Sequence, residues 1–234
     1  TYGKVQMAKM QDGTWAAVFG NGYNNTEADG IASTTGHAVL YIVDVETGDI
    51  LKKLDTGAGS TGTPNGLATP LLIDENADNI VDYIYAGDLQ GNMWKFDVDD
   101  PNTSNWDIAY SSGGVPAPMF TAPSGQPITS QPQGTFHPDN LGGFMIFFGT
   151  GKYIEETDNI GSGQTTQAFY GIWDKNDGVT PSIAVGDLNA QTITNQWEQS
   201  FDTDGDGTDD DTFTLRNVSD NPIDWDTEDG WMLT

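Results

Sequence analysis

The sequence predicts an all-β fold, a modified β-propeller in which small antiparallel sheets stand side by side. A layout of short strands and turns repeats three times along the 234 residues, and repeated sheet units of this kind are typical of propeller blades. Glycine occurs 29 times and proline 11 times, as expected where tight turns join many strands. No long apolar stripe with the 3.6-residue period of a helix is present.

The first repeated unit is expected at residues 4–63. Its opening segment, KVQMAKMQDGTWAAVFGNG (4–22), predicts two strands joined by a compact Asp-Gly turn, and the second strand ends in Gly20. The segment AVLYIVDVETGDILKKL (38–54) then predicts a strand in which aliphatic and aromatic residues alternate and an aspartate stands at the end.

Two further units follow the same plan, at residues 64–125 and 126–184. The second contains LATPLLIDENADNIVDYIYAGDLQG and NMWKFDV, and the third contains SQPQGTFHPDNLGGFMIFFGTG and QAFYGIWDKNDG. The glycines that close the second strand of each unit are Gly20, Gly87 and Gly149, which are 67 and 62 residues apart. Typical blades have about 40–50 residues, so we expect loops to be inserted in these units.

Residues 185–234 are expected to form an insertion with an acidic loop, followed by the start of a next blade. A closed ring needs about four to eight blades. The present length provides about three to four, so we expect an incomplete set from a larger ring. The chain also begins and ends inside predicted strands, which indicates a fragment of a longer protein. A β-sandwich with a coincidental repeat is the alternative fold.

The charge is strongly acidic, with a formal net charge of −27 and 28 aspartates among the 35 acidic residues. This excess argues against nucleic-acid binding, because phosphates require Lys and Arg, and it favours divalent cations. The absence of cysteine removes disulfides and thiolate chemistry. No segment reaches the roughly 18 apolar residues of a membrane-spanning helix, and no signal peptide is visible.

The loop DENADNIVD (74–82) lies between two predicted strands and is crowded with carboxylates. Their repulsion would destabilise a bare turn, whereas a hard cation would reverse the effect. The spacing matches positions 1, 3, 5, 7 and 9 of EF-hand-type calcium loops, although the bidentate glutamate of position 12 is missing. The expected Ca²⁺ ligands of this first site are Asp74, Asn76, Asp78, the Ile80 carbonyl and Asp82. A solvated acidic turn is the alternative.

A second loop, FDTDGDGTDDD (201–211), has the same spacing, with glycine at the sixth position. The expected Ca²⁺ ligands of this second site are Asp202, Asp204, Asp206, the Thr208 carbonyl and Asp210. The polar residues around the loop favour a place on a flexible insertion. The segment DKNDG (174–178) has acids only at its first and fourth positions and is expected to be an ordinary turn.

No catalytic residues are predicted, so we expect a protein that is not an enzyme. The two histidines, His37 and His137, lie in different units, and a lone histidine in a loop is more often exposed than catalytic. No G-x-S-x-G motif is present. The recurring GNG, GDLQG and GTG segments fit turns at strand ends better than phosphate-binding loops. Trp94 and Trp173 stand at equivalent places in two units and are expected to pack between blades.

One family resembles this chain along nearly its full length. The segments VFGNGYNN, LYIVDVETG, NGLATPLLIDENAD, DYIYAGDLQGNMWKFD, FFGTGKYIE, QAFYGIWD and RNVSDNPIDWDTEDGW resemble, in order, the C-terminal propeller domain of PilC/PilY-type type IV pilus-associated proteins. GNGYN, YAGDLQGNMWKFD and FGTGKY are specific as a set. The resemblance implies a modified β-propeller with a calcium loop just before the YAGDL strand, which falls on Asp74, Asn76, Asp78, Ile80 and Asp82.

The resemblance also implies a place and a role. The domain would be extracellular, at the bacterial cell surface, the pilus tip or the outer membrane. Its partners would be pilins or minor pilins and, beyond them, host or abiotic surfaces. It would support pilus assembly, counter retraction, and take part in twitching motility and adhesion.

Two other functions remain open. LYIVDVETGDIL resembles the strand–turn motif of pyrroloquinoline-quinone propellers, which would make the chain an enzyme of the dehydrogenase type. Those repeats usually continue to a tryptophan, where Lys52-Lys53 stands here. The second possibility is a purely structural secreted module that calcium stabilises.

Overall fold

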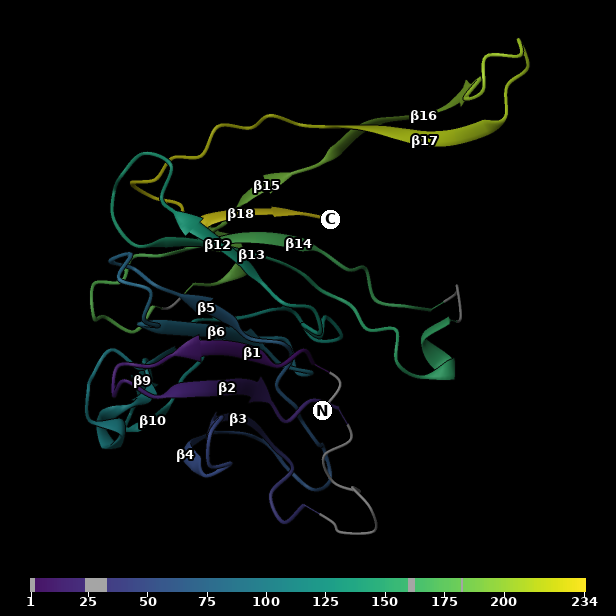
Figure 1. The fold of residues 1–234 in the computed structure, drawn as a ribbon. Helices are drawn as coiled ribbons and strands as arrows, with labels where there is room; N and C mark the ends of the chain where they lie inside the picture. The colour runs from purple at the N-terminus through teal and green to yellow at the C-terminus, as the bar shows by residue number, and fades with distance from the viewer. Residues whose placement is uncertain (1–2, 24–32, 160–162, 182) are drawn as a thin grey trace.

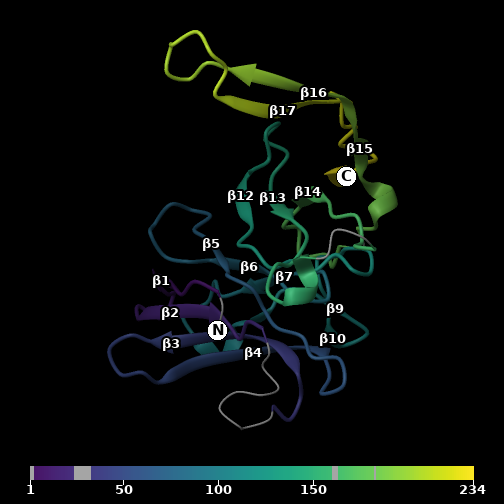
Figure 2. The same ribbon diagram turned by 90° about the vertical axis from the view of Figure 1, so that its right-hand side faces the viewer.

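The computed structural model describes residues 3–23, 33–159, 163–181 and 183–234. Figure 1 shows three sheets stacked one above another, with a long two-stranded arm projecting from the last of them. We number the sheets first, second and third in chain order. The hairpin of β16 (Ile193–Phe201) and β17 (Asp211–Val218) is called the arm. The stack is also visible after a quarter turn in Figure 2.

The first sheet is a four-stranded antiparallel meander with the order β1-β2-β3-β4. Its strands are β1 (Gln6–Lys9), β2 (Trp15–Gly20), β3 (His37–Asp44) and β4 (Ile50–Gly59). Gly13 in the β1–β2 turn has a φ of 88°, which glycine adopts without steric cost. These strands lie where the alternating pattern of the first unit predicted them.

The second sheet has the order β11-β7-β6-β5, with β8 also paired to β7. Its strands are β5 (Leu71–Ile73), β6 (Tyr83–Gly87), β7 (Asn92–Asp97), β8 (Asp107–Ile108) and β11 (Phe120–Thr121). The connection from β7 to β11 holds the 3-10 helix η1 (Thr103–Asn105) and the small ribbon β9 (Ser111–Ser112) and β10 (Val115–Pro116). The acidic loop 74–82 therefore joins β5 to β6.

The third sheet has the order β12-β13-β14-β18-β15. Its strands are β12 (Gln133–Phe136), β13 (Phe144–Gly149), β14 (Phe169–Asp174), β15 (Asn189–Gln191) and β18 (Gly230–Leu233). The pairing of β15 with β18 is parallel, and the other pairings are antiparallel. Two short 3-10 helices, η2 (Glu156–Asn159) and η3 (Val185–Asp187), lie in its connections.

The last part of the chain differs from the sequence prediction, which assigned residues 185–234 to an insertion and the start of a next blade. In the structure β18 returns to the third sheet and pairs with β14, with Met232 opposite Tyr170. The arm, formed by β16 (Ile193–Phe201) and β17 (Asp211–Val218), projects away from this sheet (Figure 1). Pairing between strands so distant in the chain leaves no local signal in the sequence.

Apolar side chains fill both spaces between the sheets. Successive side chains of a strand point to opposite faces, so the second sheet contributes to both layers. The layer between the first and second sheets includes Val18, Leu40, Ile42, Ile84 and Phe96. The layer between the second and third sheets includes Tyr85, Met93, Ile146, Phe148 and Tyr170. Sheets packed face to face in series are the arrangement of propeller blades, so the predicted fold class is confirmed.

Two of the repeated glycines are required by close packing. A Cβ atom on Gly20 would lie 2.2 Å from the carbonyl oxygen of Leu67, and one on Gly87 would lie 2.1 Å from Cγ2 of Ile128. The segment that leads into the next sheet thus crosses directly over the strand end. A Cβ atom on Gly149 would lie 3.6 Å from Cδ2 of Phe169, which is an ordinary van der Waals contact. The third glycine therefore does not share this role.

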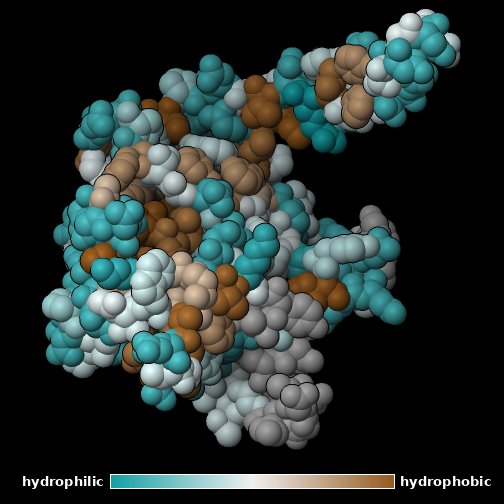
Figure 3. Space-filling view, viewed as in Figure 1, coloured by the Kyte–Doolittle hydropathy of each residue, from teal (hydrophilic) through white to brown (hydrophobic). Residues whose placement is uncertain are grey.

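The surface drawn in Figure 3 is hydrophilic at the tip of the arm and more apolar toward its base. Within the described residues, no helix has both the length and the apolar character needed to cross a bilayer.

Candidate metal sites

Loop 74–82 folds around its own side-chain oxygens. Asp74 accepts hydrogen bonds from the backbone N–H groups of Asp78 at 3.1 Å and Asn79 at 2.7 Å. Asn76 Oδ1 also accepts from the Asp78 N–H at 2.9 Å, and Asp78 accepts from the Ile80 N–H at 2.8 Å. The first, third and fifth positions of the predicted calcium motif therefore face the inside of one compact turn.

The two ends of this loop are joined by its last acid. Asp82 Oδ2 accepts a hydrogen bond from the Glu75 N–H at 2.7 Å. Ala77 and Asn79, at positions 4 and 6, have φ values of 62° and 67°. The left-handed region costs an ordinary residue roughly 1–2 kcal/mol, and asparagine tolerates it better than alanine. The loop holds this strained backbone because its side chains bond back to the main chain.

Loop 202–210 repeats this arrangement with a different sequence. The first position again accepts two backbone N–H groups, the third and fifth accept one each, and the ninth accepts one from the second position. The donors and distances are Gly205 and Gly207 to Asp202 at 2.6 and 2.8 Å, Asp206 to Asp204 at 3.0 Å, Thr208 to Asp206 at 2.8 Å, and Thr203 to Asp210 at 3.0 Å.

Positions 4 and 6 of the second loop are Gly205 and Gly207, with φ values of 81° and 91°. Two segments that share only the spacing of their oxygen-bearing residues therefore fold alike. The common geometry follows from the motif itself. The side-chain oxygens at the third and fifth positions accept from the N–H two residues later, and the first aspartate accepts from N–H groups three to five residues later.

The donor sets of both loops fit a hard divalent cation. Ca²⁺ takes six to eight oxygen ligands from carboxylates, amides, carbonyls and water, and every side-chain donor in these loops is an oxygen. Asp202, Asp204 and Asp210 each bring a carboxylate oxygen within 4.8 Å of the others, and in the described part of the chain this is the one acidic trio gathered so closely. The acids of the first loop are more widely spread.

The hydrogen bonds of the second loop also hold its carboxyl groups in the charged form. The N–H groups of Gly207 and Gly205 lower the pKa of Asp202. The hydroxyl and the N–H of Thr203 lower the pKa of Asp210. Both groups are therefore carboxylates at neutral pH, which is the form that binds a cation.

The two loops differ in their surroundings. Residues 202–210 are all exposed at the tip of the arm, as Figure 1 shows. The first loop is exposed at residues 75–79, but its end packs against the sheets, and Asp82 is only 1% exposed. Beside it, burial and the carboxylates of Asp82 and Asp97 raise the pKa of Asp99. Sequence reasoning did not select Asp97, the last residue of β7, or Asp99, two residues beyond it.

A buried ion pair lies between the second and third sheets. Lys95 on β7 and Asp174 on β14 are 2% and 1% exposed, and their charged groups are 2.9 Å apart. The hydroxyls of Tyr85 and Tyr110 both donate to the Asp174 carboxylate. The Lys95 ammonium lies 4.2 Å from the centroid of the Tyr83 ring.

The environment of Asp174 favours its ionised form. Burial alone would raise the pKa of Asp174, but the Lys95 ammonium and the two tyrosine hydroxyls together lower it. The pKa of Tyr85 is raised, first by burial and then by the Asp174 carboxylate. The chain does turn after Asp174, as predicted for DKNDG (174–178), with positive φ values at Asn176 and Gly178. The prediction missed that Asp174 itself is a buried connection between two sheets. The sequence does contain one sign of this buried pair, because Lys95 is a charged residue between Trp94 and Phe96 in a predicted strand.

Neither histidine has the exposed position that the sequence suggested. His137 is 2% exposed and lies between the rings of Trp173 and Trp225, with centroids 4.5 and 4.4 Å away. This burial lowers the pKa of His137. His37 is half-buried, and its Nδ1 lies 2.9 Å from a carboxylate oxygen of Asp55.

The two equivalent tryptophans have different roles. Trp94 belongs to the apolar layer between the first and second sheets, and its indole N–H donates to Asp88 at 2.8 Å. Trp173 instead packs with His137, and its indole N–H donates to the Gly142 carbonyl at 3.0 Å. The expectation that both pack between blades therefore holds within this chain for Trp94 alone.

Comparison with known proteins adds to this geometry. A family model described as the PilY1 beta-propeller domain matches residues 1–205. The type IV pilus biogenesis factor PilY1 of Pseudomonas aeruginosa strain PAO1 is 37% identical over 251 residues, covering 98% of this chain and 20% of that protein. A PilY1 homolog of Xylella fastidiosa strain Temecula1 is 38% identical over 206 residues, covering 82% of this chain and 13% of that protein.

A solved structure shows the same architecture. The crystal structure of the Pseudomonas aeruginosa PilY1 C-terminal domain aligns with a TM-score of 0.82 at 36% sequence identity, covering 100% of this chain and 50% of that one. The present chain thus spans about a fifth or less of the length of the curated relatives and half of the solved domain.

Proposed function

Because this chain belongs to the PilY1 β-propeller family, we propose that it is a calcium-binding, non-enzymatic domain of a type IV pilus biogenesis factor. The relatives are named as biogenesis factors of the type IV pilus and not as enzymes. They are about five to six times longer than this chain, since 98% of it covers 20% of the first and 82% of it covers 13% of the second, so their activity is carried over here as part of the proposal.

The observation that carries the calcium part is the paired loop geometry. Asp74, Asn76, Asp78 and Asp82, with the Ile80 carbonyl, would hold one Ca²⁺ ion. Asp202, Asp204, Asp206 and Asp210, with the Thr208 carbonyl, would hold a second. The bound ion would supply positive charge where three or four carboxylates converge. Loops of this kind span micromolar to millimolar affinities, and the exposed second loop is expected at the weak end.

In the cell, the domain would act outside the cytoplasm, on the pilus tip or the bacterial surface. Its partners would be pilins or minor pilins, and it would contact host or abiotic surfaces during adhesion. Calcium would rigidify the β5–β6 hairpin and so fix the surface that the propeller presents. This state would favour pilus assembly over retraction and thereby set twitching motility.

Calorimetry tests the binding part of the proposal. Chelator-treated protein is titrated with CaCl₂ beside Asp78→Asn and Asp204→Asn, which keep the side-chain shape and remove one carboxylate from each loop. Asp107→Asn, an exposed acid outside both loops, is the control. We expect two binding steps, with one weakened in each loop variant and neither in the control. An absence of binding heat at millimolar calcium would refute both sites.

A cellular assay tests the pilus part. Asp78→Asn is placed in the full-length protein, and surface pili and twitching zones are measured with and without calcium. We expect fewer surface pili and smaller zones than for Asp107→Asn. Unchanged pili, in a variant whose calcium binding is lost in vitro, would contradict calcium control of the pilus.

The quinoprotein alternative makes a different prediction. A pyrroloquinoline-quinone enzyme would become coloured and would reduce an artificial electron acceptor after reconstitution with quinone and calcium. We expect neither change, and redox turnover in that assay would overturn the non-enzymatic assignment.

A further inference from the structure

We propose that loop 74–82 is a clamp that ties the three sheets together, and that Gln11 and Glu75 are the positioning residues that couple its calcium site to the neighbouring sheets. This inference rests on the proposed calcium site in the same loop. It adds the way in which an ion held there would act on the rest of the molecule.

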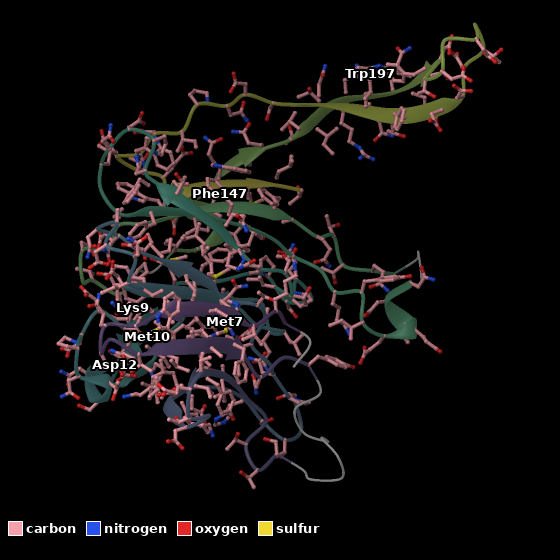
Figure 4. All side chains as sticks on the ribbon, in the orientation of Figure 1. Met7, Lys9, Met10, Asp12, Phe147 and Trp197 are labelled. Atoms are coloured by element: carbon pink, nitrogen blue, oxygen red, sulfur yellow. The ribbon has the colours of Figure 1, made fainter. Side chains whose placement is uncertain are left out.

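The first connection reaches the first sheet. Gln11 lies in the β1–β2 turn, and its side-chain Nε2–H donates to Asp82 Oδ1 at 2.7 Å. One residue earlier, the Val81 N–H donates to the Lys9 carbonyl at 3.1 Å. Lys9, the last residue of β1, and Asp12, the turn residue after Gln11, are labelled in Figure 4. Because Asp82 is only 1% exposed, its carboxylate has little access to water and depends on these protein donors.

The second connection reaches the third sheet. Glu75 Oε1 accepts a hydrogen bond from the Asn176 side chain at 3.2 Å. Asn176 in turn receives the Lys95 ammonium on its Oδ1 at 2.5 Å, and donates its own N–H to Asp174 at 3.0 Å. The loop is therefore linked to the buried Lys95–Asp174 pair that joins the second and third sheets.

The two connections meet at one carboxylate. Asp82 Oδ1 accepts a hydrogen bond from the side chain of Gln11, beside the first sheet. Asp82 Oδ2 accepts one from the N–H of Glu75, whose side chain accepts one from Asn176, just after β14 of the third sheet. Asp82 is also the last predicted calcium ligand of the loop. Drawing Asp82 toward an ion shared with Asp74 and Asp78 would thus fix both ends of the clamp at once.

Thermodynamic linkage makes this coupling reciprocal. If ion binding tightens the contacts to Gln11 and Asn176, those contacts must strengthen ion binding by the same factor. Neither Gln11 nor the Glu75 side chain occupies a ligand position of the motif, so each can be removed without removing a ligand. The arm offers an internal comparison, because loop 202–210 has the same local geometry but, among the residues that the structure describes, forms hydrogen bonds only within its own hairpin.

The test uses the whole chain in its calcium-free and calcium-loaded forms. The variants are Gln11→Ala and Glu75→Ala, and the matched control is Gln199→Ala, the same substitution on the exposed arm. Glu75 is exposed, so Glu75→Ala folds even if Gln11→Ala does not. Calorimetry gives the dissociation constant of each loop, and hydrogen exchange reports on the β1–β2 turn and on residues 174–176.

In the wild type, calcium is expected to slow exchange at both reporter segments. Each clamp variant should weaken binding at loop 74–82 about tenfold and lose the calcium-dependent protection of its own neighbouring segment. Binding at loop 202–210 should not change in any variant. A structural role without coupling would lower stability but leave the calcium-dependent protection intact.

The outcomes separate the clamp from the site on which it rests. If Asp78→Asn abolishes binding at loop 74–82 while both clamp variants bind like the control, the calcium site stands and the clamp is wrong. If wild-type protein binds no calcium at this loop, the proposed function and the clamp fail together.

Discussion

Replacing Lys95 with methionine tests whether the buried ion pair holds the second and third sheets together. Methionine keeps much of the side-chain volume and removes the charge. Breaking one partner of a buried pair typically costs about 3–5 kcal/mol, because the remaining charge is left without its counter-ion. Asp174 would keep the hydroxyls of Tyr85 and Tyr110 and the Asn176 N–H. We therefore expect the lower end, about 3 kcal/mol at pH 7.

That loss is large against a total stability of about 5–15 kcal/mol. With a urea m-value near 3 kcal/mol/M for a chain of this size, the unfolding midpoint should fall by about 1 M. The assay is urea unfolding followed by tryptophan fluorescence. Lys53→Met, at an exposed lysine on β4, is the control and should shift the midpoint little.

The pH dependence gives the prediction its sign. In the wild type the folded-state pKa of Asp174 is lowered, so its stabilisation is present above the unfolded pKa of about 3.9 and is lost as the pH falls through the folded value. Without Lys95, burial dominates and raises the pKa of Asp174. Protonation of Asp174 then removes the unpaired charge from the variant as the pH falls. The difference in unfolding free energy between wild type and Lys95→Met should therefore narrow from pH 7 to pH 4.

Two results would refute this reasoning. One is a stability for Lys95→Met within about 1 kcal/mol of the Lys53→Met control at pH 7, against the 3–5 kcal/mol typical of a broken buried pair. The other is a gap between wild type and Lys95→Met that stays constant between pH 7 and pH 4.

The remaining predictions concern the two loops and the buried histidine. Calcium at a hundred times the dissociation constant of loop 74–82 should stabilise the fold by about 2.7 kcal/mol and raise its melting temperature by about 5–10 °C, whereas Asp78→Asn should abolish this increase in a calorimetric scan. Ala77→Gly should relieve the left-handed backbone and raise stability by up to about 1 kcal/mol in chemical unfolding; a loss of stability would show that no strain resides there. His137 has a lowered folded-state pKa. The stability that its neutral imidazole contributes is therefore present above the unfolded pKa of about 6.5 and declines as the pH falls toward the folded pKa. His137→Phe should therefore flatten the stability profile between about pH 6.5 and pH 5, and an unchanged slope would assign that dependence to other groups.

The local features of this protein could be predicted from its sequence. Short apolar runs bounded by turn residues placed strands such as β3 and β13, because such runs are typical of strands that are buried on both faces. The oxygen-bearing residues of loops 74–82 and 202–210 indicated their turns, because each side chain reaches a backbone N–H only a few residues away. The predicted ligands in each loop gather in one turn, and whether they hold calcium stays a prediction.

The connections between sheets could not be predicted in this way. Asp174 looked like a turn residue and His137 like an exposed one, and β18 gave no sign of returning to β14. The bond from Gln11 to Asp82 joins residues that share no local pattern. Local sequence sets which hydrogen bonds a short segment can make with itself. Burial and ion pairing depend on which distant segments exclude water from a polar side chain. The pairing of strands depends on which distant segments lie side by side. Only the packed tertiary structure decides both.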